Sequence, residues 1–147
     1  MKPSFQGNAV ALLPALGLYL AACATPALHF WNTNSQAEAS YFGIHTLLMG
    51  PLAILGGQLS WFANLFFAAG ALALLLGHCR VATVFAVIAL PITAHALSLY
   101  GHALPANEGG VGELQLRSFG PGFYLWVASA AALAIGALVR HRSSRQT

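Results

Sequence analysis

Long uncharged stretches dominate the chain, and short segments between them hold most of its charged residues. The stretches cover residues 8–30, 60–77, 81–100 and 123–139. A helix rises about 1.5 Å per residue, so about 20 apolar residues cross a hydrocarbon layer of roughly 30 Å. The 60–77 stretch is slightly short and needs flanking residues to cross. The pattern predicts an all-α fold, a polytopic membrane helix bundle with four transmembrane helices.

A fifth apolar stretch covers residues 42–57 and is shorter. Its aliphatic side chains follow the spacing of one helical stripe; they are Ile44, Leu47, Leu48, Leu52 and Leu55. This spacing favours a short helix that lies in the external interface or re-enters the membrane from that side. The alternative is a short fifth span that turns at Gly56 and Gly57.

The charged residues orient these spans. There are six lysine and arginine residues against three aspartate and glutamate residues. The positive-inside rule places Arg80 and the basic tail 140–147 in the cytoplasm, so residues 101–122 form an external loop. With four spans both termini are cytoplasmic, and all the acids lie outside. Those acids are Glu38, Glu108 and Glu113. We expect a single integral domain in a membrane, the bacterial inner (plasma) membrane.

Tryptophan and tyrosine residues gather near the outward ends of the four predicted spans. Their rings favour the headgroup region because each combines an apolar body with a polar atom. A five-span arrangement would move two of them to the cytoplasmic side, so the aromatic pattern also favours four spans. We expect these residues to form an interface, the aromatic rim, made of Trp31, Tyr41, Trp61, Tyr100, Tyr124 and Trp126.

Three local signals concern the first span, the external loop and the start of the last span. The sequence Leu20-Ala21-Ala22-Cys23 resembles a lipoprotein cleavage box, but the apolar run continues past it, so we expect an uncleaved first span. In the external loop, apolar and polar residues alternate over 114–119, which predicts a short strand or an extended interfacial segment. Pro121 suits the first turn of the last helix.

Small residues and one proline predict how the helices pack. Close helix contacts in membranes favour small side chains. The candidates are Ala128, Ala131 or Ala132, and Gly136 on the last helix, with Ala69, Ala73 and Gly77 on the second. Pro91 predicts a kink in the third helix, because proline removes a backbone donor and clashes with the preceding turn.

The composition excludes several classes of protein. The chain is 58% hydrophobic and 6% charged, with a mean hydropathy of +0.71. Soluble domains carry roughly a quarter charged residues, so a soluble enzyme is excluded, and so much apolar sequence does not stay disordered in water. The arginines of the tail follow an apolar run directly, which is typical of a membrane anchor. We therefore expect no nucleic-acid partner.

Four histidines in the outer half of the predicted bundle are the candidate cofactor or metal ligands: His29, His45, His95 and His102. The last two are seven residues apart, which is two turns along one helical face. Imidazoles arranged in this way bind transition metals or haem iron. However, the sequence has no H-x-x-x-H or C-x-x-C spacing and no carboxylate within a span.

Catalytic motifs are otherwise absent from the sequence, including a phosphate-binding loop, a nucleophile elbow and an intramembrane acid for proton transport. The leading hypothesis is a non-enzymatic accessory or assembly subunit. Its aromatic rim would face membrane lipids, another membrane protein or a second copy of the chain. One alternative is a histidine-ligated redox or metal-handling protein that holds haem or a transition metal. Another is a passive channel or carrier for a small neutral solute beside Pro91.

Overall fold

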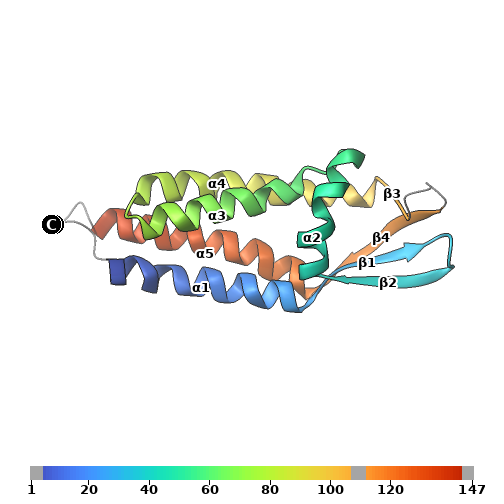
Figure 1. Ribbon diagram of the computed structural model, residues 1–147, viewed down its shortest axis with the longest axis horizontal. Coiled ribbons are helices and arrows are strands. Elements are labelled where there is room, and N and C mark those ends of the chain that lie inside the picture. Colours follow the sequence, from blue (N-terminus) through green and yellow to red (C-terminus); the bar gives the residue numbers. More distant parts are fainter. Residues whose placement is uncertain (1–4, 107–111, 144–147) are drawn as a thin grey trace.

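A bundle of long helices with a β-sheet extending from one end makes up the molecule (Figure 1). The computed structural model describes residues 5–106 and 112–143. The predicted external loop is therefore described except for 107–111, which includes Glu108, and the basic tail is described as far as 143. The bundle helices are α1 (Phe5–Ala24), α3 (Ala63–Leu75), α4 (Cys79–Ala94) and α5 (Pro121–Ser143).

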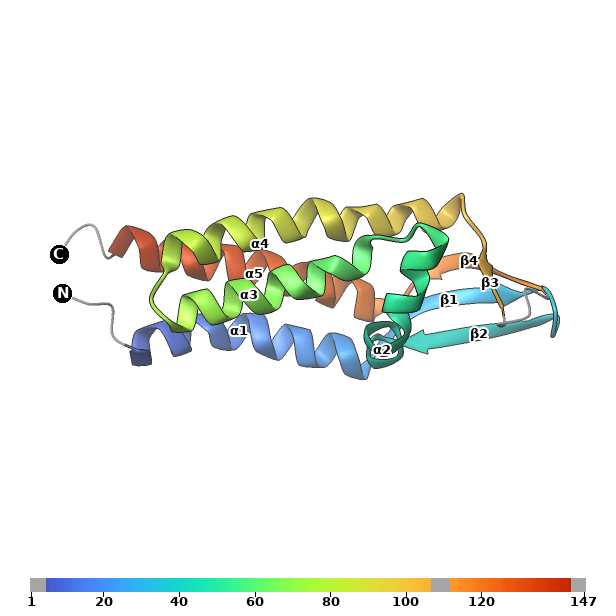
Figure 2. The same cartoon turned by 45° about the horizontal axis from the view of Figure 1, so that its top comes forward.

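Short 3-10 helices extend two bundle helices towards the sheet. Helix η2 (Ser60–Phe62) leads into α3, and η3 (His95–Tyr100) continues α4. Within the described residues, three apolar helices are long enough to cross a membrane: Phe5–Ala24, Cys79–Tyr100 and Pro121–Ser143. The helix Ser60–Leu75 is shorter but lies beside them in both views (Figure 2). The prediction of a mostly helical fold with helices long and apolar enough to cross a membrane is confirmed.

Four antiparallel strands form the sheet in the order β2-β1-β4-β3. They are β1 (Pro26–Asn32), β2 (Ala37–Phe42), β3 (Leu104–Pro105) and β4 (Glu113–Phe119). The alternation over 114–119 correctly predicts β4, and Pro121 begins α5 as expected. The all-α prediction is wrong in overlooking this sheet, which unites the segment after α1 with the segment before α5.

The predicted first span, 8–30, is wrong at its end. Helix α1 ends at Ala24, and Pro26 begins β1. Proline lacks a backbone donor and disfavours helical geometry in the residue before it, so an apolar run does not suffice to continue the helix. The Thr25 hydroxyl donates to the Ala21 carbonyl at 2.9 Å and so satisfies one group at the helix end.

The fifth apolar stretch is helical, as its spacing predicts. It forms α2 (Gly43–Ala53) and the 3-10 helix η1 (Ile54–Gly56). Helix α2 lies across the sheet end of the bundle rather than alongside the long helices (Figure 1). The start of α1 and the end of α5 lie together at the opposite end (Figure 2).

Small side chains fill the bundle core, although not all of the predicted ones. Gly136 packs against α1 as expected, since a Cβ there would lie 2.7 Å from the Ala11 carbonyl oxygen. Ala128 is exposed, and Ala69 and Ala73 are half-buried, because the contact faces are rotated from the predicted stripes. The faces that are buried include Gly70, Ala71 and Leu74 on α3 and Ala130, Leu133, Ala134 and Ala137 on α5.

Pro91 lies inside α4 as predicted. The helix remains α-helical to Ala94 and changes to the 3-10 form at His95. A 3-10 segment is narrower than an α-helix and has poorer hydrogen-bond geometry, so the regular α-helical hydrogen bonding ends at this point. The change places His95 at the start of the segment that reaches the sheet.

Candidate functional site

A chamber of about 830 Å³ lies between the sheet end of the bundle, α2 and the inner face of the sheet. The sheet contributes Phe30 and Leu114, α2 contributes Leu47 and Met49, and the bundle contributes Trp126 among others. The described residues that line the chamber include no aspartate, glutamate, lysine or arginine. Its walls are thus uncharged and mostly apolar, and its volume is within the range of small-molecule sites.

Close backbone contacts hold α2 over the chamber. The Gly43 N–H donates to the Thr25 carbonyl at 3.0 Å, and a Cβ at Gly43 would overlap the Ala22 carbonyl. Further along α2, the Trp61 Nε1–H donates to the Leu47 carbonyl at 2.8 Å. Gly50 lies directly against the same indole, so a side chain at this position would collide with it. Trp61 therefore holds α2 against η2 at the chamber wall.

Asn64 joins three bundle helices at the inner end of the chamber. Its Oδ1 accepts from the Tyr19 hydroxyl of α1 and from the Trp126 indole of α5, each at 2.9 Å. Its Nδ2 donates to the Trp61 carbonyl at 3.0 Å. An indole N–H only donates and a carbonyl only accepts, so these partners fix the orientation of the amide. We call these three hydrogen bonds the Asn64 tie; they orient the polar residues of an otherwise apolar chamber.

Below Asn64 the bundle is packed. The Tyr19 ring stacks on Phe67 with ring centroids 4.7 Å apart. Beyond this pair Ala15, Leu74 and Leu133 have no solvent exposure. The described chamber therefore has a closed floor of tightly packed side chains.

A second polar network stands at the edge of the chamber around the buried Gln58. The Ser98 hydroxyl donates to the His95 carbonyl, so its oxygen accepts from Gln58 Nε2 at 3.2 Å. This orients Gln58 Oε1 towards the Ser60 N–H and towards His95 Nδ1, which lies 2.7 Å away. Because Oε1 only accepts, His95 carries its proton on Nδ1. Gln58 thereby connects the segment before α3 to η3.

The four candidate histidines lie on separate elements. His29 on β1 bonds the Ser40 hydroxyl at 2.8 Å, and His45 on α2 packs edge-on against Phe42. His102 lies beyond the end of η3 and donates from Nδ1 to the Ser98 carbonyl at 3.1 Å. Among the described residues, no group of three His, Cys, Asp or Glu side chains gathers in a way that would hold a metal. Of the four histidines, the chamber wall includes His45.

The aromatic rim divides into two groups. Tyr41, Trp61 and Trp126 line the chamber. The other three do not: Trp31 on β1 lies under the Arg117 guanidinium, 5.6 Å from the ring centroid, while Tyr100 and Tyr124 are exposed. Half of the predicted interface is therefore turned inward, towards a cavity that the sequence does not reveal.

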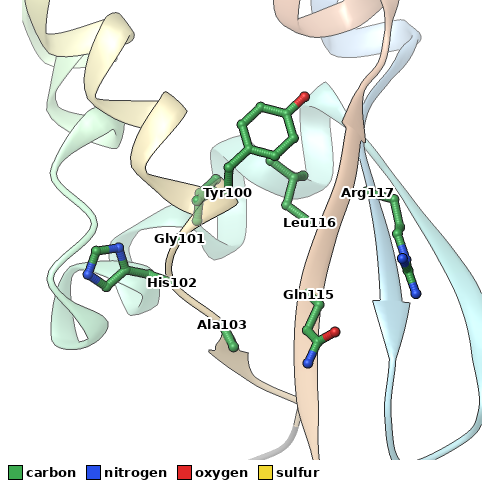
Figure 3. A pocket seen from close by; sticks show the side chains of 8 residues that line it. Tyr100, Gly101, His102, Ala103, Gln115, Leu116 and Arg117 are labelled. Carbon is green, nitrogen blue, oxygen red and sulfur yellow. The ribbon is translucent and has the colours of Figure 1, made fainter.

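A smaller pocket of about 270 Å³ lies between the end of η3 and β4 (Figure 3). Tyr100, Gln115 and Leu116 are among its lining residues. In Figure 3 the His102 ring points away from β4, and the Arg117 side chain extends over β1. The two basic side chains thus do not converge on one point in this pocket.

Comparison with known proteins adds no family to this description. The chain matches no protein-family model, and searches of curated proteins and of solved structures also find no match.

Proposed function

We propose that the chain crosses the bacterial inner membrane four times, with both termini cytoplasmic. The proposed spans are α1, α3 with η2, α4 with η3, and α5. Arg80, Arg140 and Arg142 belong to the helix ends opposite the sheet, whereas the described acids Glu38 and Glu113 lie on the sheet. Arg117 on β4 is the basic exception among these residues; otherwise this separation of charge favours placing the sheet outside.

In this orientation α2 belongs to the outer interface. It has no buried residue, and it exposes apolar side chains such as Leu48 and Leu52; Leu55 of the following η1 is exposed as well. Such a surface is costly in water but favourable among lipid chains. Its position across the bundle end supports an interfacial helix rather than a fifth span.

The chamber is the proposed working part of the molecule. It holds a neutral, mostly apolar molecule drawn from the outer leaflet, and the protein acts without catalysis as an accessory subunit that presents this molecule to a membrane partner. The observation that carries the proposal is a large chamber with uncharged walls. Burying a charge without a partner is strongly unfavourable, so such walls select neutral ligands.

The closed floor of the chamber favours a protein that holds its ligand over a channel that lets a solute pass across the membrane. Tyr19 and Asn64 bond each other across the inner end, and the side chains below them are packed. A ligand that enters beside α2 meets this floor instead of a path to the other side. The few polar groups, including the Tyr19 hydroxyl and the Cys23 thiol, suit a single polar group on the ligand.

The experiment is to identify lipids that copurify with the protein in mild detergent. Ala53 lies on the chamber side of α2, and Leu48 lies on the same helix but is 66% exposed and outside the chamber lining. Ala53→Phe should reduce the amount of retained neutral lipid because the larger side chain obstructs the chamber beside α2, while Leu48→Phe should leave it unchanged. Equal retention by both variants would contradict the proposal.

A further inference from the structure

Arg140 is held in a fixed position at the end of the bundle opposite the chamber. It lies in the last turn of α5, and its Nε–H donates to Asn8 Oδ1 of α1 at 3.0 Å. Asn8 has no solvent exposure, so this bond anchors the guanidinium to a buried amide. A long arginine side chain is usually mobile at a helix end, and ordering it has an entropic cost.

The backbone next to Asn8 is shaped around this guanidinium. A Cβ at Gly7 would lie 2.9 Å from Arg140 Cζ and 2.9 Å from Nη2. Any side chain at this position would displace the charged group. Gly7 thus leaves the space that the guanidinium occupies between α1 and α5.

The surroundings of Arg140 contain hydrogen-bond donors, but no carboxylate of the described residues lies beside them. The described carboxylates, Glu38 and Glu113, lie on β2 and β4 at the opposite end of the molecule. Asn8 Nδ2 is buried and has no hydrogen-bond partner within the described part of the chain. Buried donors are rarely left unpaired, so a missing acceptor needs an explanation. Arg80 at the start of α4 and Arg142 on α5 add positive charge at this end of the bundle.

We propose that Arg140 binds the phosphate group of an anionic phospholipid in the cytoplasmic leaflet. The bond to Asn8 uses one of the five N–H donors of the guanidinium, and the planar pair Nη1 and Nη2 matches two phosphate oxygens. Asn8 is a positioning residue that orients this pair. The leaflet assignment rests on the proposed topology, but the site itself does not depend on the chamber.

Binding is measured by native mass spectrometry and thermal unfolding in a neutral detergent, with added phosphatidylglycerol or phosphatidylcholine. The wild type should bind phosphatidylglycerol more tightly than phosphatidylcholine. Arg140→Gln should weaken the binding of phosphatidylglycerol about tenfold, because a charge-assisted hydrogen bond is lost. Arg142→Gln removes the same charge at an exposed neighbouring position and should keep the preference.

Asn8→Asp tests the site while keeping the Arg140 side chain in place. The new carboxylate pairs with Arg140, replaces the unpaired Nδ2 donor and competes with the phosphate, so the protein should stay folded while losing its preference for phosphatidylglycerol. Equal loss in Arg142→Gln would mean general charge attraction and would overturn the proposal. If inorganic phosphate stabilises the wild type as much as phosphatidylglycerol does, the site takes a soluble anion and the lipid assignment is wrong. Neither result bears on the ligand of the chamber.

Discussion

Replacing Asn64 tests whether its amide ties the bundle together at the chamber. Asn64→Leu keeps a similar volume but removes the acceptor of Tyr19 and Trp126 and the donor to the Trp61 carbonyl. Interhelical hydrogen bonds in membrane proteins contribute on average about 0.6 kcal/mol and at most about 1.7 kcal/mol. The bonds to Tyr19 and Trp126 are interhelical, whereas the bond to Trp61 is local, so losing the two interhelical bonds should lower the free energy of unfolding by about 1 to 3 kcal/mol.

The assay is reversible unfolding in mixed micelles, with Tyr19→Phe and the double variant completing a mutant cycle. Tyr19→Phe removes one of the three bonds, so the cycle should give a coupling of at least about 0.5 kcal/mol. Thr83→Val is the control, because the Thr83 hydroxyl bonds the Cys79 carbonyl within a single helix. A loss for Asn64→Leu no larger than for Thr83→Val, or a coupling of zero, would refute this account of the tie.

Three further predictions concern packing, local order and topology. Gly136→Ala should destabilise the bundle by about 1–3 kcal/mol because the new methyl group meets the Ala11 carbonyl, whereas Gly17→Ala, which meets open space, should not destabilise it in the same unfolding assay. Gln58→Leu should speed amide hydrogen exchange in η3, since it removes the link to His95; unchanged exchange would show that this link does not order η3. Reporter fusions at the two termini should both be cytoplasmic, and reporters on opposite sides would exclude four spans.

Hydropathy predicted the helices well but missed where the first one stops. Pro26 lies within the apolar run, and its effect on the preceding backbone outweighs the hydrophobic signal. The β-hairpin that follows also has a sequence signal. The Asn32 side chain accepts from the N–H groups of Asn34 and Ser35, which is typical of an asparagine turn. The turn-forming residues at 32–36 therefore indicate the β-hairpin, which hydropathy averaged along the chain does not show.

The chamber was not predictable from residue types alone. Asn64 and Gln58 were the informative residues, because isolated amides in apolar segments need partners. Their partners come from other helices, and spacing along one chain does not identify them. The four histidines were predicted as ligands because imidazoles bind metals, yet they lie on separate elements. The pairing of β1 with β4 over the bundle end creates the chamber, and this pairing joins segments far apart in sequence.

Fluorescence quenching by a brominated neutral diacylglycerol tests the ligand-binding chamber most directly. In a Trp31→Phe background the remaining tryptophans, Trp61 and Trp126, both line the chamber. We predict saturable quenching that is weakened by Ala53→Phe and unchanged by Leu48→Phe. Quenching that is equally strong in the Ala53→Phe variant would place the lipid outside the chamber and contradict the proposed function.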